Sequence, residues 1–344
     1  MTALATTSAA ATLDKRIRRV VRLHLDSTDG SPFWLRRAEM AGVRASDVDG
    51  LADLNLLGDV TTDELRAAPL RDLVPASLWR DGRSLRTVQT GGTTGPGVWT
   101  CYREDEFAEA FVEPFVVAAR HVAFPLGGPW LFIGPSGPHV IGQAAMAIAR
   151  ATGSPAPFSV DFDPRWAVKL AEGTFARRRY VEHVLEQSLA VLRSQAVEVL
   201  FATPPILLKL ADRLDRSQRV EIRGIHYGGM RVTAEMLDRL GESFPRAMHL
   251  PGYGNTLLGC LLPLVIDEAP PTYFPLGHRL LLEIDRGQLR VSRFDESMLI
   301  VRLLERDIGE SQDAPPDAPA GFELPGIRDP RPPTSNVQFT QGLY

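Results

Sequence analysis

The sequence predicts an α/β protein with parallel α/β layers and a smaller antiparallel sheet or barrel near the C-terminus. Between residues 130 and 255, short apolar segments alternate with amphipathic segments, which is typical of parallel strands joined by helices. After residue 270, the short strand-like segments HRLLLEID, QLRVSRF and SMLIVRLL follow one another, separated by turn residues. This second pattern favours antiparallel pairing.

Individual elements follow from the same reasoning. Residues 13–45 are expected to be helical, and ASDVDGLADL and VTTDELRAAP are expected to form short helices capped by Ser or Thr. Pro114 should bend the helix that contains it. PWLFIGPSGPHVIG predicts a buried strand, a loop and a helix from near Ile141, and RRYVEHVLEQSLAVLRSQ predicts an amphipathic helix.

Composition excludes several classes of protein. The 344 residues carry a formal net charge of −4, which gives no electrostatic case for nucleic acid or an anionic membrane as a partner. No apolar stretch approaches 18 residues, and the N-terminus lacks the apolar segment of a signal peptide. Two cysteines, Cys101 and Cys260, suit a reducing compartment. We therefore expect a cytoplasmic protein.

The segment TGGTTGPG, from Thr90 to Gly97, is dense in glycine and threonine. Backbone N–H groups and hydroxyls at such a turn are suited to holding phosphate. The segment has neither the Gly-Lys-Ser/Thr ending of a Walker loop nor the spacing of a dinucleotide fingerprint. Taken alone, it leaves both a phosphate loop and a plain flexible loop open.

The segment GPSGPHVIG raises a second question. Pro138 stands where a nucleophile elbow requires its second glycine, which argues against a hydrolase. His139 either lines a substrate pocket, where it could orient a carboxylate, or is a loop histidine satisfied by the backbone. Cys260 is read as a small buried residue, with a covalent acyl-cysteine as the alternative. The histidines and cysteines show no metal-ligand spacing.

Five stretches in the right order resemble the adenylate-forming superfamily, which activates carboxylic acids as acyl-AMP. TGGTTGPG resembles its phosphate loop, HYGGMRVTAEMLDRL its adenine-stacking strand and turn, and GYGNT its Tyr-Gly-x-Thr motif. LIVRLLERDIGE places Asp307 where the family has a ribose-binding aspartate. SPFWLRRAEMAGVRASDVDGLADL is similar to the entrance segment of phenylacetate–coenzyme A ligases and coenzyme F390 synthetase-like proteins. The resemblance covers residues 31–310.

This resemblance implies the large N-terminal domain of an adenylate-forming enzyme, with ATP or AMP as ligand and Mg²⁺ left open. It implies catalytic roles for Thr256 and His139. The implied nucleotide-binding residues are Thr90, Gly91, Gly92, Thr93, Thr94, Gly95, Gly228, Gly229, Met230, Tyr253, Gly254, Asn255, Thr256 and Asp307.

The resemblance also implies a domain organisation. We expect a helical segment over residues 1–80 packed on the core and a nucleotide- and acyl-binding α/β core over 81–270. A small β subdomain over 271–310 and an irregular tail over 311–344 should follow, without the mobile C-terminal domain of the family.

The sequence departs from the family pattern at three places. Val98 stands where the phosphate loop usually ends in lysine, and Leu257 stands where a glutamate usually helps to hold Mg²⁺. The family's C-terminal domain carries a further lysine, whereas the last lysine here is Lys209. Loss of these charges should weaken stabilisation of the adenylation transition state.

The resemblance therefore predicts ATP-dependent activation of an aromatic or other small carboxylic acid in a biosynthetic pathway, such as that of a secondary metabolite. The acceptor would be CoA, an amine, a carrier protein or a reductase, and a homodimer is left open. The alternative is a catalytically degenerate protein that binds nucleotide or acyl-AMP and assists a pathway enzyme. Asp307 and Tyr253 argue against a third reading, an acyltransferase that never uses ATP.

Overall fold

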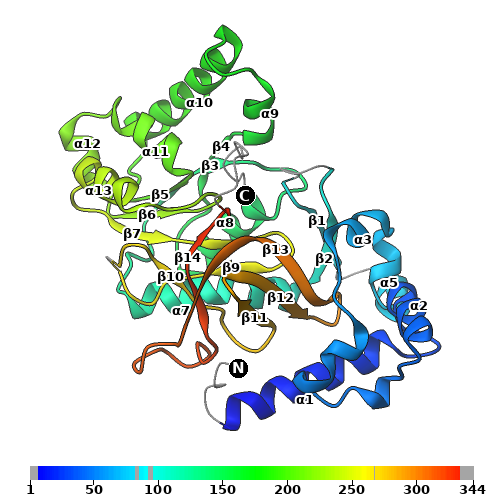
Figure 1. Ribbon diagram of the computed structural model, residues 1–344. Coiled ribbons are helices and arrows are strands. Elements are labelled where there is room, and N and C mark those ends of the chain that lie inside the picture. Colours follow the sequence, from blue (N-terminus) through cyan, green and yellow to red (C-terminus); the bar gives the residue numbers. More distant parts are fainter. Residues whose placement is uncertain (1–6, 82–84, 92–95, 267, 334–344) are drawn as a thin grey trace. The chain divides into compact units, whose positions relative to one another are not determined.

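The structure, a computed structural model, describes residues 7–81, 85–91, 96–266 and 268–333 (Figure 1). The chain forms two compact units. The first comprises residues 1–90, 96–110 and 274–335, and the second comprises residues 91–95, 111–273 and 336–344. Each unit is described by itself below.

The second unit is built on a five-stranded sheet with the order β4-β3-β5-β6-β7, in which neighbouring strands pair in parallel. Its strands are short, and the central strands β3, β5 and β6 are fully buried, as expected for a sheet covered on both faces. This confirms the parallel α/β layers expected from the sequence. The strands are β3 (Trp130–Gly134), β4 (Phe158–Asp161), β5 (Val199–Ala202), β6 (Gly224–Tyr227) and β7 (Met248–Pro251).

Side chains alternate between the two faces of this sheet. Leu131 and Ile133 belong to a cluster shared with the helices α10, α11 and α13, whereas the Trp130 ring meets Phe115 of α7 with 5.6 Å between centroids. Helices therefore cover both faces (Figure 1). The helices are α7 (Glu113–His121), α8 (Val140–Ala151), α9 (Pro164–Lys169), α10 (Phe175–Ser194), α11 (Pro204–Ala211), α12 (Arg216–Glu221) and α13 (Ala234–Ser243).

The first unit contains antiparallel strands in the order β14-β13-β12-β11. The turn between β11 and β12 places Arg286 and Gly287 at φ of 50° and 82°, which is the two-residue turn that matches strand twist. The smaller antiparallel sheet expected near the C-terminus is thus confirmed. The strands are β11 (Leu280–Asp285), β12 (Gln288–Phe294), β13 (Leu299–Gln312) and β14 (Gly326–Arg331).

Strand β14 is a difference from the sequence prediction, which treated residues 311–344 as irregular. Proline-rich composition suggested a linker there, but the long strand β13 offers its edge, and Gly326–Arg331 pairs with Ile308–Gln312 of that strand. Pro330 is tolerated because it falls at a register shift between the Ile308 and Glu310 pairings.

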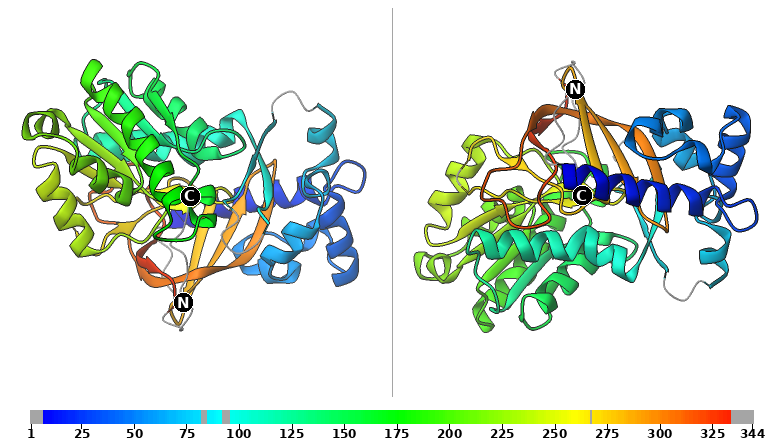
Figure 2. Two further views of the ribbon diagram at one scale, coloured as in Figure 1. Left: turned by 90° about the horizontal axis from the view of Figure 1, so that it is seen from above. Right: turned by 90° about the horizontal axis from the view of Figure 1, so that it is seen from below.

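The N-terminal part of the first unit is helical, and α1 packs on β12 and β13, as the right-hand view of Figure 2 shows. Residues 13–45 do not form one helix. Asp26 Oδ1 accepts hydrogen bonds from the Thr28 and Asp29 amides, and a Cβ on Gly30 would lie 2.5 Å from the His24 carbonyl oxygen. This tight turn separates two helices. The elements are α1 (Thr7–His24), α2 (Pro32–Ala41), the 3₁₀ segments Ala45–Asp47 and Leu51–Leu57, α3 (Thr62–Ala67), α4 (Leu70–Leu73) and α5 (Ala76–Asp81).

The remaining elements are short. α6 (Glu104–Phe107) continues into a π-helical segment, Ala108–Val112, so the bend expected at Pro114 is realised by that segment just before the proline. Small strands complete the chain: β1 (Leu85–Gln89), β2 (Trp99–Arg103), β8 (Tyr253–Asn255), β9 (Gly259–Leu261) and β10 (Thr272–Tyr273). Among the described residues, no helix is long and apolar enough to cross a membrane.

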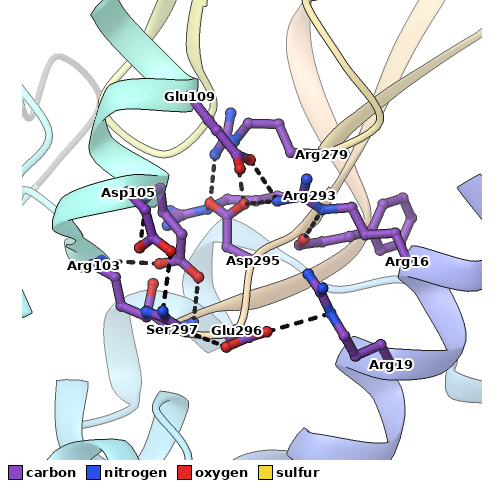
Figure 3. Close-up of polar contacts among 12 residues, drawn as sticks. Arg16, Arg19, Arg103, Asp105, Glu109, Arg279, Arg293, Asp295, Glu296 and Ser297 are labelled. Carbon is purple, nitrogen blue, oxygen red and sulfur yellow. Dashed lines mark hydrogen bonds and ion pairs between the residues drawn. The ribbon is translucent and has the colours of Figure 1, made fainter.

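A buried ion cluster lies in the first unit, around Asp295 in the β12–β13 connection (Figure 3). Arg279 donates to its two oxygens at 3.1 and 2.5 Å, and Arg293 donates to Oδ2 at 2.5 Å. Arg16 of α1 approaches Oδ1 at 3.4 Å and bonds Glu109 at 2.8 Å. Because buried charges are tolerated only when paired, this cluster ties segments that are far apart in sequence.

Candidate active site

The carboxyl ends of the five parallel strands of the second unit meet at one edge of the sheet. Strand β3 lies between β4 and β5. The connection after β3 leads to β4 on one side and the connection after β5 leads to β6 on the other side, so the strand order reverses between β3 and β5. Ligands of open α/β sheets bind at such reversals, outside the carboxyl ends of the strands. His139, Gly228–Met230 and Tyr253–Thr256 follow β3, β6 and β7 and therefore share this edge.

His139 is the residue just before α8, and its side chain is buried, with 5% exposed. Its Nε2 atom has no hydrogen-bond partner among the described residues. Burial lowers the pKa of His139, and the positive charge of Arg165 lowers it further, against smaller raising effects of Asp163 and Asp161. The ring is therefore neutral at pH 7, where it can accept or donate one hydrogen bond at Nε2 according to its tautomer.

The loops after β3 and β4 are joined at this place. The Ser136 amide donates to Asp161 Oδ1 at 3.0 Å, and Arg165 donates to both oxygens of Asp163 at 3.1 and 3.0 Å. The Asp163 amide donates to the Tyr180 hydroxyl at 2.8 Å. Arg165, Asp161 and Asp163 were not among the predicted site residues. All three lie in the segment VDFDPRW, and its two carboxylates one residue apart are the sequence feature that could have pointed to them.

The glycines after β6 are required by close backbone contact. A Cβ on Gly228 would lie 2.8 Å from the Gly252 carbonyl oxygen, and Gly229 has a φ of 79°. A Cβ on Gly252 would in turn lie 3.0 Å from the His226 ring. The backbone after β6 thus approaches the backbone after β7, and Met230 beyond it is half-buried. A glycine turn of this kind suits a ligand that needs close backbone approach.

The GYGNT segment forms a tight hairpin of β8 and β9. Asn255 Oδ1 accepts hydrogen bonds from the Leu257 and Leu258 amides at 2.9 and 3.1 Å, and a Cβ on Gly254 would lie 2.0 Å from the Gly259 carbonyl oxygen. The asparagine side chain therefore holds the turn. Thr256 is buried in it, with 4% exposed.

Tyr253 lies half-buried at the start of this hairpin and pairs with Tyr273, with 5.6 Å between ring centroids and 38° between planes. Its aromatic ring is held in place, which suits stacking on a planar ligand. Cys260 is half-buried at this hairpin, and desolvation of its sulfur raises the pKa of the thiol to about 12. The thiol stays protonated at neutral pH, which favours the small-buried-residue interpretation over a nucleophile.

Leu257, at the position where the resemblance expects a metal-binding glutamate, is buried with 4% exposed. No group of three or more His, Cys, Asp or Glu side chains that could hold a metal ion occurs in the part of the chain that the structure describes. Leu257 itself offers no oxygen ligand to Mg²⁺, which is usually held by one or two carboxylates together with the phosphates of a nucleotide.

The glycine-threonine segment lies in sequence between β1 and β2 of the first unit, which pair antiparallel. The Thr90 amide donates to the Val98 carbonyl at 3.0 Å, and Thr90 Oγ1 accepts from the Val98 amide at 2.9 Å. Thr90 thus closes the base of the loop, and Val98 is buried. Gly92, Thr93, Thr94 and Gly95 lie outside the described residues, and Gly91 is half-buried.

Asp307 lies in β13, at an irregularity of the first unit's sheet. Gln288 pairs with Ile308 and Arg290 with Leu304, so residues 305–307 stand opposite Leu289 alone. A bulge of this kind re-aims side chains and is common beside binding sites. The sequence could not show this irregularity, because it depends on the partner strand.

No protein-family model matches this sequence, and no curated protein matches it. Among solved structures, the chain is similar to 2-hydroxyisobutyryl-CoA ligase in complex with 2-HIB-AMP and CoA in the thioesterification state. The TM-score is 0.66 at 15% identity, over 94% of this chain and 68% of that chain. An open conformation of that ligase with the same ligands gives 0.67 at 14% identity, over 95% and 75%.

The postadenylation state of the same ligase, in complex with 2-HIB-AMP, gives a TM-score of 0.68 at 14% identity, over 95% of this chain and 69% of that chain. Identities this low speak for the fold alone. The fold expected from the sequence is thus confirmed: this chain is built like the large domain of an adenylate-forming CoA ligase.

Proposed function

We propose that this chain uses ATP to activate a small carboxylic acid, aromatic or of similar size, as an acyl-adenylate for a biosynthetic pathway. The acid's carboxylate would attack the α-phosphate and release pyrophosphate. A thiol or amine would then displace AMP. CoA is the acceptor with most support, because the similar ligase is captured with acyl-AMP and CoA.

One observation carries this proposal. His139, Gly228–Met230 and Tyr253–Thr256 all follow carboxyl ends of one parallel sheet, where ligands of such sheets bind. In this proposal, Gly228–Met230 and the Tyr253 ring bind the adenine. His139 contacts the acyl group, and Thr256 acts on its carboxylate.

The remaining roles fall on Asp307 and on the segment from Thr90 to Gly95. Asp307 would accept hydrogen bonds from the ribose hydroxyls, and the bulge at residues 305–307 supports a side chain directed at a ligand. The segment from Thr90 to Gly95 would bind the phosphates. We propose no protein ligand for Mg²⁺, since Leu257 is buried and apolar.

The test is calorimetry with ATP and AMP on the wild type and on Asp307→Ala. Each hydrogen bond to a charged group contributes roughly 1.5–3 kcal/mol, so affinity for both nucleotides should fall about 10- to 100-fold. Both should fall alike because they carry the same ribose. Asp285→Ala, an exposed carboxylate at the β11–β12 turn, is the matched control and should bind like the wild type. Unchanged affinity in Asp307→Ala would refute the assignment.

Leu257 favours a second candidate function, a protein that binds nucleotide or acyl-AMP without turnover and assists a pathway enzyme. Its buried side chain removes the carboxylate that the resemblance expects. Pyrophosphate exchange distinguishes the two candidates. Nucleotide binding without exchange for any acid in a broad panel would favour the assisting protein, whereas acid-dependent exchange would favour the enzyme.

A further inference from the structure

The Nε2 atom of His139 is buried and has no hydrogen-bond partner among the described residues. Leaving such an atom unsatisfied costs roughly 1–3 kcal/mol, and such groups in native proteins call for an explanation. Other buried histidines differ. His226 Nδ1 lies 2.7 Å from the Leu250 carbonyl oxygen, and His24 Nδ1 lies 2.5 Å from Ser31 Oγ. A ligand group is the explanation that the location of His139 supports, at the carboxyl edge beside the reversal of strand order.

The charges around His139 restrict the chemistry of that group. Three charged side chains act on the ring, namely Arg165, Asp163 and Asp161. Arg165 has the largest single effect of the three on the ring, and Asp163 and Asp161 both oppose it, so the three side chains together offer no net positive charge to an anion. A carboxylate or phosphate is therefore disfavoured here. The neutral ring offers either a donor or an acceptor at Nε2, and a hydroxyl group can satisfy both tautomers.

The order of strands places His139 at a distance from the nucleotide motifs. β3 lies two strands from β6 and three from β7. With about 4.8 Å between neighbouring strands, the offsets along the edge are roughly 10 and 14 Å. An acid whose carboxylate reacts near the ends of β6 and β7 would reach His139 with the opposite end of its acyl part.

From this juxtaposition we propose that the acid substrate carries a hydroxyl group remote from its carboxylate, and that His139 Nε2 forms a hydrogen bond with this hydroxyl. The inference rests on the proposed function and names its substrate class. Because Nε2 is buried, a hydroxyl reaches it only after a local movement, and the neighbouring residues 136–138 are exposed and include Gly137 at a φ of 73°.

The experiment is ATP–pyrophosphate exchange with matched acids that differ by one hydroxyl: 4-hydroxyphenylacetate and phenylacetate, 4-hydroxybenzoate and benzoate, 6-hydroxyhexanoate and hexanoate. In at least one pair, the wild type should prefer the hydroxy acid about 10- to 100-fold in kcat/KM, because one unpaired buried polar group costs that much. His139→Leu should abolish the preference, chiefly by raising KM for the hydroxy acid. His139→Gln, whose amide can donate and accept, should retain part of it.

Equal use of both members of every pair, or a preference that survives His139→Leu, would overturn the inference while leaving adenylation intact. If no acid supports exchange, the proposed enzymatic function fails separately. Calorimetric binding of the same pairs in the presence of AMP then decides the inference. Tighter binding of a hydroxy acid that is lost in His139→Leu supports it, and no difference within any pair refutes it.

Discussion

Two buried polar side chains, one in each unit, differ in their partners. In the first unit, Asp295 is fully buried and accepts hydrogen bonds from Arg279 and Arg293, with Arg16 also close. In the second unit, His139 is nearly as buried, but its Nε2 has no partner among the described residues. The difference indicates that Asp295 serves the architecture of its unit, and it is the basis for proposing that His139 meets a ligand.

The Asp295 cluster has the properties of a structural element. Arg293 also donates to Thr100 Oγ1 at 2.9 Å and to the Cys101 carbonyl at 2.7 Å, and its guanidinium lies 3.9 Å from the centre of the Tyr102 ring. The two nearest arginines hold the pKa of Asp295 at about 2, although burial alone would raise it. The carboxylate is charged, and both of its oxygens accept hydrogen bonds from arginines. It is therefore satisfied within the protein and is not available to a ligand.

Asp295→Asn should give the largest effect on stability. It would leave buried arginines without their counter-charge, and breaking a buried pair in this way costs about 3–5 kcal/mol. Urea unfolding at pH 7 measures the loss. Asp285→Asn, at an exposed turn of the same sheet, is the control and should stay within about 0.5 kcal/mol of the wild type. A small effect of Asp295→Asn would show that the cluster does not stabilise the unit.

Leu257→Glu should have the next largest effect on stability. It replaces a buried apolar side chain, 4% exposed, by a group that must be buried without a prepared partner, and we expect a loss of about 3 kcal/mol. The matched variant Leu257→Met keeps the apolar volume and should cost under about 1.5 kcal/mol. The melting temperature measures the effect of the new carboxylate on stability, and pyrophosphate exchange measures its effect on adenylation. A stable Leu257→Glu protein with faster exchange would mean that the site admits a metal after all.

Much of the fold could be predicted from the sequence because its signals are local. Short apolar segments around Leu131, Leu200 and Ile225 alternate with amphipathic segments, which marks them as buried parallel strands. Thr61 forms the expected threonine N-cap of α3. Strand β14 could not be predicted, since its pairing with β13 lies outside its own proline-rich sequence.

The candidate site divides in the same way. Its glycines could be predicted from the sequence, because only glycine permits a close backbone contact such as that of Gly228 with Gly252. The bulge at Asp307 and the unpartnered ring of His139 depend on neighbours distant in sequence, so no local pattern reveals them. The structural work of Asn255 within its turn was likewise not predicted, because the motif suggested a ligand contact.

The pH dependence of stability should reflect two buried histidines, His24 in the first unit and His226 in the second. Burial lowers the pKa of each to about 4, from 6.5. Between these values the unfolded chain binds more protons, so stability falls as the pH falls and is unaffected above about pH 7. At pH 5 each should cost about 2 kcal/mol.

Urea unfolding at pH 7 and pH 5 measures this loss. His226→Gln should remove about 2 kcal/mol of it, since His226 then no longer contributes. His183→Gln changes an exposed histidine and should retain all of it. If His226→Gln kept the full loss, the pH dependence would originate elsewhere.

The smallest expected effect, and the one that most sharpens the comparison, is that of His139→Leu on stability. Leucine removes a buried polar atom that has no partner among the described residues, and removing an unsatisfied group relieves a cost of roughly 1–3 kcal/mol. This gain offsets the change in packing. We therefore expect a free energy of unfolding within about 1 kcal/mol of the wild type, or above it.

His226→Leu is the matched control, since His226 is 3% exposed but its Nδ1 lies 2.7 Å from the Leu250 carbonyl oxygen. It should cost about 1–3 kcal/mol because that carbonyl loses its donor. Urea unfolding at pH 7 compares the two variants. If His139→Leu lost as much as His226→Leu, His139 would be bonded within the folded chain, and the contrast between a satisfied core and a ligand-ready edge would fail.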